Sequence, residues 1–264
     1  MNFFKNLLWF VAYPFVALYI IVQMILAAIM AKKYKNDPEA VNVNDRYKKI
    51  MAIIDEVLYL KNIKVDLIGK ENVSIKSMLY IGNHKSNGDP LVLLKALYQI
   101  SPHNVRFVAK IELQKSFLKF LFNLIDVIYI DRNNLRQAIS TIDEQVNALK
   151  QTYRGLVIFP EGTRNFSHEF NEFKSGTLTA AYNTLSSIQP FVIFNSQGSF
   201  ESKDDKKQKL RNNPFKTQHI KVSFLEPIHS FNYINVNKDI LMRRIQTNIK
   251  KNYDELLKST IKTN

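Results

Sequence analysis

The feature that most limits how this chain can fold lies near its N-terminus, where residues 7–30 include no charged side chain. A helix of roughly 20 apolar residues is long enough to cross the hydrocarbon core of a bilayer. Trp9, Tyr13 and Tyr19 are amphipathic aromatic residues of the kind that is enriched where a membrane meets water. The sequence therefore predicts a membrane anchor over residues 1–35.

Two residues within this run complicate a straight span. Pro14 lacks a backbone donor, so it should kink a helix or divide it. Gln23 is polar and sits among apolar neighbours. A helix that spans the bilayer and a bent or re-entrant segment that lies in one leaflet are therefore both compatible with the sequence.

The charges on either side of the run predict its orientation. Lys5 alone precedes it, whereas Lys32, Lys33 and Lys35 follow it. An excess of basic residues marks the cytoplasmic side of a membrane helix, so we expect the rest of the chain on the cytoplasmic face of the cell membrane. The run is also longer than the apolar region of about 7–15 residues that is typical of a cleaved signal peptide.

Beyond a polar linker at residues 36–44, strand-like apolar stretches alternate with stretches of helical periodicity. Strands are expected at residues 63–68, 77–81, 105–109, 127–130, 155–159, 190–194 and 219–224. Helices are expected at residues 45–60, 91–100, 134–150, 177–185 and 238–258, with another amphipathic helix between the third and fourth strands. Residues 201–216 read as a charged loop. This order of elements indicates an α/β domain, which we place at residues 36–264.

Composition restricts the classes of function. The 37 Lys and Arg residues exceed the 23 Asp and Glu residues, which gives a net charge of +14. A charge of this size is compatible with an acidic partner or surface and equally with a purely solubilising role. Nucleic acid, anionic lipid and an acidic carrier protein all qualify. The chain has no cysteine, which excludes disulfides, thiolate metal sites and a cysteine nucleophile. Glycine-rich nucleotide-binding motifs are absent from the sequence as well.

The segment YIGNHKSNGDPLVLL places His84 in a turn after an expected strand and Asp89 at the start of an expected helix. Because Pro90 suits the first position of a helix, Asp89 is a natural N-cap. The turn can bring the two side chains together, so that the carboxylate orients the imidazole and leaves one ring nitrogen as a base. A hydroxyl is a poor nucleophile until a base removes its proton.

The segment GLVIFPEGTR runs from an expected buried strand into a turn. Gly162 allows close approach of the backbone, Thr163 adds a hydroxyl, and Arg164 carries a planar donor fork that suits a phosphate. The turn is therefore a candidate site for a phosphate-bearing substrate. A surface turn with a Glu–Arg pair is the alternative interpretation.

Together, and in this order, the two segments resemble the glycerolipid acyltransferase family, and more narrowly the 1-acylglycerol-3-phosphate acyltransferases. The family's N-H-x-x-x-x-D is matched by Asn83, His84 and Asp89, and its F-P-E-G-T-R by residues 159–164. Lys110, Glu112 and Leu113 match its K-x-E-L, and Asp131 and Arg132 match its later D-R. Phe173, Lys174 and Gly176 match its F-K-x-G, and the segment Pro190, Phe191 and Val192 is similar to its fourth motif. The chain departs from the family at Phe117, Phe120 and Asp126, where Pro or Gly is common.

The resemblance implies a mixed central sheet flanked by helices, and a fatty acyl transfer to the sn-2 hydroxyl of 1-acylglycerol 3-phosphate that gives phosphatidic acid. His84 would be the general base and Asp89 would orient it. Backbone amides near Gly162, or Lys110, would stabilise the oxyanion. The residues expected to bind the acceptor are Glu161, Gly162, Thr163, Arg164, Lys110 and Arg132.

The donor implied by the resemblance is acyl-CoA or acyl-carrier protein, and neither a metal nor a bound cofactor is expected. Glycerol 3-phosphate, dihydroxyacetone phosphate or a lysophospholipid with a larger headgroup are alternative acceptors. A membrane-tethered basic adaptor without enzymatic activity is an alternative of a different class. It would explain the charge and the anchor but not the F-P-E-G-T-R turn.

Overall fold

The computed structural model describes residues 2–74, 76–100, 104–131, 133–151, 154–201 and 216–263. Within these residues, seven strands form one sheet in the order β1-β7-β6-β2-β5-β3-β4. The strands are β1 (Ile63–Ile68), β2 (Leu79–Gly82), β3 (Asn104–Lys110), β4 (Ile128–Ile130), β5 (Arg154–Ile158), β6 (Ile188–Phe194) and β7 (Gln218–Phe224).

The sheet is mixed, as the resemblance implied. Strands β6, β2, β5, β3 and β4 run parallel to one another, whereas β7 pairs antiparallel with β6 and parallel with β1. Strands β2 and β6 are buried along their whole length, which agrees with the continuous apolar runs typical of central parallel strands.

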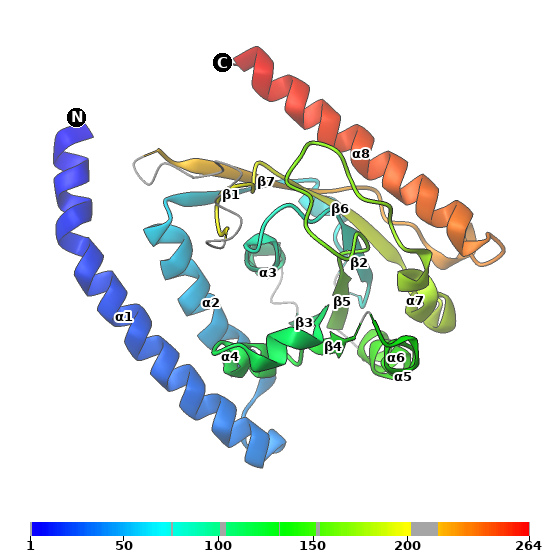
Figure 1. Ribbon diagram of the computed structural model, residues 1–264, viewed down its shortest axis with the longest axis horizontal. Coiled ribbons are helices and arrows are strands. Elements are labelled where there is room, and N and C mark those ends of the chain that lie inside the picture. Colours follow the sequence, from blue (N-terminus) through cyan, green and yellow to red (C-terminus); the bar gives the residue numbers. More distant parts are fainter. Residues whose placement is uncertain are drawn as a thin grey trace.

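Helices cover both faces of the sheet (Figure 1). On one face lie α2 (Val43–Leu60) and α3 (Asp89–Ile100), and on the other lie α6 (Ile142–Lys150), α7 (Thr179–Thr184) and α8 (Lys238–Thr263). Alternation along the strands divides the core between the faces, because successive side chains of a strand point to opposite sides. Tyr80 joins the α2 and α3 side, whereas Leu79 and Ile81 join the α8 side.

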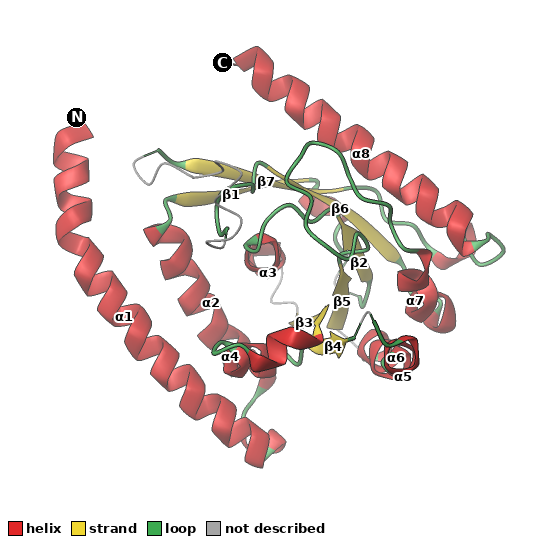
Figure 2. Cartoon of the chain, viewed as in Figure 1, coloured by secondary structure: helices red, strands yellow, loops and turns green. Residues whose placement is uncertain are grey.

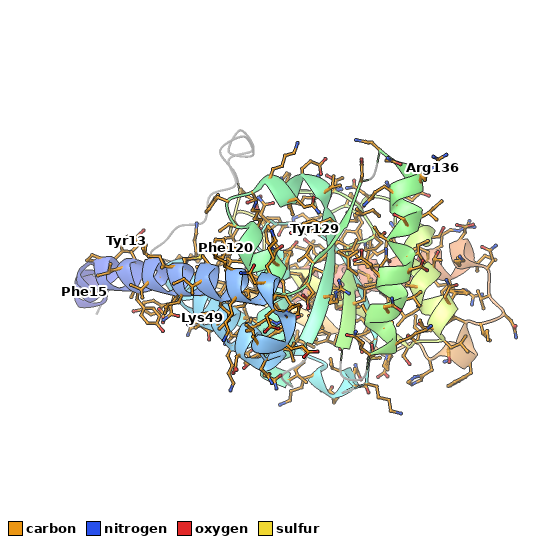
Figure 3. All side chains as sticks on the ribbon, turned by 90° about the horizontal axis from the view of Figure 1, so that it is seen from below. Tyr13, Phe15, Lys49, Phe120, Tyr129 and Arg136 are labelled. Carbon is orange, nitrogen blue, oxygen red and sulfur yellow. The ribbon has the colours of Figure 1, made fainter. Side chains whose placement is uncertain are left out.

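The N-terminal helix α1 (Asn2–Asn36) is continuous, with Pro14 inside it. Pro14 therefore does not divide the segment into a hairpin, which was one form of the bent anchor that the sequence allowed. By length and composition, residues 13–36 could cross a membrane, and no other helix in the described part of the chain meets this test. Figure 3 shows Tyr13 and Phe15 on the part of α1 that extends beyond the domain, whereas Lys49 and Phe120 lie where the helix meets it.

One side of α1 packs on α2 and on the short helix α4 (Lys119–Leu124) through the buried residues Ala27 and Ala31. Gln23 is also on this side, where its Oε1 accepts a hydrogen bond of 2.8 Å from Lys49 Nζ. Its polarity therefore does not interrupt the outer face of the helix. That face is apolar and exposed, and it includes Phe15, Leu18, Ile21, Ile25 and Ile29.

The C-terminal end of α1 is fastened to the domain through Asp126. Its carboxylate accepts from Tyr34 Oη at 2.7 Å and from Arg46 Nη1 at 3.1 Å, and the Arg46 guanidinium lies 3.9 Å from the centre of the Tyr34 ring. Asp126 has a φ of 51°, a conformation that favours glycine. This geometry explains both the glycine that is common in the family at this position and what the aspartate adds here.

Two of the predicted helices differ in the structure. Residues 134–150 form two helices, α5 (Leu135–Ser140) and α6, which are separated at Thr141, whose Oγ1 donates to the Ala138 carbonyl at 2.8 Å. The helix predicted at residues 177–185 is a 3-10 turn, η4 (Ser175–Leu178), followed by the short α7. The other predicted helices and the strands are confirmed, with ends displaced by a few residues. Residues 202–215 of the predicted charged loop lie outside the described residues.

Candidate active site

The sequence motifs gather at one edge of the sheet. Because β6, β2, β5, β3 and β4 are parallel, their carboxyl ends lie at the same edge, which is where open α/β sheets bind ligands. His84 follows β2, Glu161 follows β5, and Lys110 ends β3. Figure 2 shows irregular loops between α3 and α8 near this edge, and the light-green colour in Figure 1 identifies the segment after β5 among them.

His84 and Asp89 form the pair that the sequence predicted. The imidazole Nδ1 lies 2.9 Å from Asp89 Oδ2, and the imidazole is 19% exposed whereas the carboxylate is fully buried. An ionised carboxylate only accepts hydrogen bonds, so Nδ1 carries the proton and Nε2 keeps a lone pair. The imidazole ring also stacks on Phe159, with 4.4 Å between ring centroids. The pairing and the stacking together fix the orientation of a partly exposed base.

Asp89 does not have the N-cap role that its sequence position predicted. It is the first residue of α3, and its Oδ2 accepts backbone N–H groups of the preceding turn, from Lys85 at 2.6 Å and Ser86 at 2.8 Å. The other oxygen, Oδ1, has no hydrogen-bond partner among the described residues. The carboxylate therefore shapes the turn that carries His84 in addition to orienting the imidazole.

Asn83 and Glu161 hold this turn in place. The Asn83 side chain donates to the Ile193 carbonyl at 2.8 Å and accepts from the Ile193 N–H at 2.9 Å, which extends the pairing of β2 with β6. Glu161 Oε1 accepts from the His84 backbone N–H at 2.8 Å, and Oε2 accepts from the Asn171 N–H at 2.8 Å. The two predicted motifs are thus joined directly.

Glu161 was expected to bind substrate. Its side chain is buried, and burial raises the pKa of its carboxyl, an effect that the two backbone N–H groups and Lys85 oppose. With both oxygens engaged by backbone donors, this side chain is suited to holding the two turns together.

Gly162 has a φ of 71°, which favours glycine, and its N–H donates to the Phe159 carbonyl at 3.1 Å. The Gly162 amide is therefore engaged within the turn. Thr163 is exposed, and Arg164 is 25% exposed, with Nη1 at 3.1 Å from Glu201 Oε2. The turn accordingly presents a hydroxyl and a guanidinium beside His84.

Two other residues at this edge, Lys85 and Glu201, were not among the predicted site residues. Lys85 is fully buried, and its Nζ donates to the Ser167 and Glu169 carbonyls and lies 4.4 Å from the centre of the Phe170 ring. Burial lowers the pKa of Lys85 to about 8. Glu201 ends a turn after β6 and pairs with Arg164. In the sequence, Lys85 has polar neighbours and Glu201 begins a charged stretch, so both would be expected at the surface. Their burial depends on contacts with residues far away in the sequence.

The remaining predicted residues are placed less directly. Lys110 is exposed at the end of β3, which is separated from β2 by β5. Asp131 follows β4 and accepts from the Asn133 N–H at 2.9 Å. Arg132 lies outside the described residues. In the part of the chain that the structure describes, no group of three or more His, Asp or Glu side chains is arranged to hold a metal ion.

Comparisons with known proteins agree with this geometry. The family model described as Acyltransferase matches residues 64–194. A probable 1-acyl-sn-glycerol-3-phosphate acyltransferase of Mycoplasma pneumoniae is 37% identical over 238 residues, which cover 88% of this chain and 87% of the relative. One of the same description from Mycoplasma genitalium is 35% identical and covers 89% of this chain and 88% of the relative.

The crystal structure of the 1-acyl-sn-glycerophosphate (LPA) acyltransferase from Thermotoga maritima superimposes with a TM-score of 0.64. The match covers 97% of this chain and 98% of that one, at 18% sequence identity. At this identity the similarity establishes the fold alone.

Proposed function

This chain belongs to the 1-acyl-sn-glycerol-3-phosphate acyltransferase family, and from that premise we propose how its own residues carry out the reaction. It transfers a fatty acyl group from an acyl thioester to the free sn-2 hydroxyl of 1-acylglycerol 3-phosphate and gives phosphatidic acid for phospholipid synthesis. The observation that carries the proposal is the His84–Asp89 pair of 2.9 Å, joined through Glu161 to the turn that bears Arg164.

His84 acts as the general base. Its Nε2 takes the proton of the acceptor hydroxyl while the hydroxyl oxygen attacks the thioester carbonyl carbon. The tetrahedral intermediate then collapses, the C–S bond breaks, and the thiolate takes the proton back from the imidazolium. Asp89 stabilises the imidazolium that exists between these two transfers. A positioned base of this kind contributes about 10²–10⁴-fold to a rate.

The acceptor phosphate binds at the turn after β5. Arg164 supplies a charged donor fork, Thr163 a hydroxyl, and Gly162 lets the backbone approach the ligand. Lys110 adds positive charge at the same edge of the sheet, and Glu161 holds the turn beside His84. Arg132 is a further candidate for binding the phosphate on the ground of the D-R motif alone. Charge-assisted hydrogen bonds to a phosphate are about twice as strong as neutral ones, so this end of the acceptor fixes the position of its hydroxyl.

Residues 1–35 anchor the enzyme, and residues 36–264 form the acyltransferase domain. The exposed apolar side of α1 suits a lipid environment, and the basic residues Lys32, Lys33 and Lys35 support an orientation with the domain on the cytoplasmic face. Each basic residue near an anionic leaflet adds about 1 kcal/mol of attraction. The acceptor and the product both reside at this surface, and the donor is acyl-CoA or acyl-carrier protein.

A panel of donors and acceptors tests the proposal. The purified full chain in vesicles is given labelled acyl-CoA or acyl-carrier protein, with 1-acylglycerol 3-phosphate, glycerol 3-phosphate or a lysophospholipid with a larger headgroup as acceptor. Phosphatidic acid from the first acceptor is the expected product. A preference for another acceptor would reassign the phosphate-bearing substrate, and no product with any acceptor would favour the basic adaptor.

A further inference from the structure

The turn at residues 196–201 forms part of the edge that carries His84 and Arg164. It follows β6, which is paired with β2, so it starts beside the turn at residues 83–88 that carries His84. It is sharply folded, since Gly198 has a φ of 79° and the Ser199 N–H donates to the Ser196 carbonyl at 3.2 Å. Its last residue, Glu201, reaches the Arg164 guanidinium.

We infer that Glu201 is a specificity-determining residue of the acceptor site: it is a built-in counter-ion of Arg164 that the acceptor phosphate has to share or displace. The inference rests on the proposed function, because it takes Arg164 as the group that binds the phosphate. Glu201 would weaken binding of the anionic acceptor, whereas Arg164 and Thr163 strengthen it.

The first argument is burial. The Glu201 side chain is 2% exposed, and its two oxygens face Arg164 Nη1 at 3.1 Å and the Gly198 N–H at 3.3 Å. By contrast, the Glu144 carboxylate, which lies 3.7 Å from Arg106, is 60% exposed. An exposed pair of that kind contributes little, whereas a buried carboxylate beside a partly exposed cation changes the charge that a ligand meets.

The second argument is that Glu201 is held at the site. The turn that carries it contacts the turn that carries His84, because the buried hydroxyls of Ser86 and Ser199 lie 3.0 Å apart. Asn87 Nδ2 donates to the Phe200 carbonyl at 3.1 Å. Phe200 also packs so closely on Gly88 that a Cβ there would lie 2.2 Å from its ring. These contacts leave the carboxylate little freedom to withdraw.

The consequence concerns charge. A phosphate monoester carries about −1.5 to −2 at neutral pH. When it binds Arg164, it either breaks the pair with Glu201 or shares the guanidinium and is repelled by the carboxylate. Both routes reduce affinity for an anionic group, so replacing Glu201 by a neutral isostere should strengthen acceptor binding.

The experiment compares Glu201→Gln with the wild type in the full chain embedded in vesicles. The KM for 1-acylglycerol 3-phosphate should fall about tenfold, as expected when one like charge is removed from a partly buried site. Inorganic phosphate should become a stronger competitive inhibitor by a similar factor. Glu144→Gln is the matched control and should leave both values unchanged. An unchanged or higher KM for Glu201→Gln, in a protein that melts cooperatively, would overturn the inference.

Two further variants keep the test decisive. If Glu201→Gln does not fold, Glu201→Asp withdraws the carboxylate from Arg164 by one methylene and should lower the KM by a smaller factor, whereas no change would contradict the inference. Arg164→Ala separates the two proposals. A raised KM for this variant, with no gain from Glu201→Gln, overturns only the role of Glu201. An unchanged KM for Arg164→Ala removes the phosphate from this turn and overturns the proposed binding site itself.

Discussion

Replacing Asp89 by asparagine separates the charge of this residue from its shape. Its Oδ2 accepts three hydrogen bonds, at 2.9 Å from His84 Nδ1, 2.6 Å from the Lys85 N–H and 2.8 Å from the Ser86 N–H, and Oδ1 has no partner among the described residues. An asparagine can place its oxygen toward the three donors and its NH2 group in the position of Oδ1. The opposite orientation would set the NH2 group against two backbone N–H groups.

The magnitudes follow from these contacts. Hydrogen bonds to a charged group contribute about 1.5–3 kcal/mol and neutral ones about 0.5–1.5, so three weakened bonds lower the free energy of unfolding by about 3–4.5 kcal/mol. Two unit charges about 4 Å apart interact by about 4 kcal/mol at an effective dielectric constant of 20. The amide dipole retains part of this stabilisation of the imidazolium, so we expect kcat to fall about 10²–10³-fold in Asp89→Asn.

The assay measures kcat at saturating acyl thioester and 1-acylglycerol 3-phosphate, together with chemical unfolding. Asp89→Ala should lose more of both, because two buried backbone N–H groups then lack their acceptor. The matched control is Asp66→Asn, since Asp66 Oδ2 lies 2.9 Å from His219 Nδ1 in an exposed pair and should not affect kcat. A kcat for Asp89→Asn within a factor of about three of the wild type would refute the reasoning that the charge of Asp89 stabilises the transition state.

Two other perturbations test the surroundings of the site. The pKa of Lys85 is about 8 in the folded chain and its ordinary value is 10.5, so between these pH values the unfolded chain binds more protons. The free energy of unfolding of the wild type should therefore rise relative to Lys85→Met as the pH is raised from 8 to 10, and a constant difference would contradict the assignment. Where α1 is attached to the domain, Asp126→Ala should have a free energy of unfolding about 1 kcal/mol lower than that of Asp126→Gly. Both variants lose the contacts of the carboxylate with Tyr34 and Arg46, but only alanine keeps the energetic cost of a positive φ. Equal stabilities would show that the backbone at Asp126 is not strained.

Local patterns in the sequence predicted most of the fold. Continuous apolar runs identified the central strands β2, β5 and β6, because buried parallel strands need apolar side chains on both faces. Helical periodicity identified α2 and α8. The single continuous α1 was less predictable, since a proline removes one hydrogen bond of a long helix without requiring that the helix end, and neighbouring contacts decide the outcome.

The candidate site was predicted in part. The pairing of His84 with Asp89 could be predicted because a turn and a helix start bring these two residues together over a short distance in the sequence. Glu161 could not be assigned in the same way, because the donors that its carboxylate meets come from residues 10 and 77 positions away. The contact of Arg164 with Glu201 spans 37 positions and depends on the parallel order of the strands.

The most direct test of acyl transfer by His84 compares two histidine variants. The purified full chain in anionic vesicles is supplied with labelled acyl thioester and 1-acylglycerol 3-phosphate, and phosphatidic acid is identified by mass spectrometry. The wild type and His219→Ala should form it at similar rates, since His219 is exposed and lies on β7 beyond β6. His84→Ala should form almost none while melting as the wild type does. Equal rates of phosphatidic acid formation in His84→Ala and the wild type would contradict a general base at this position.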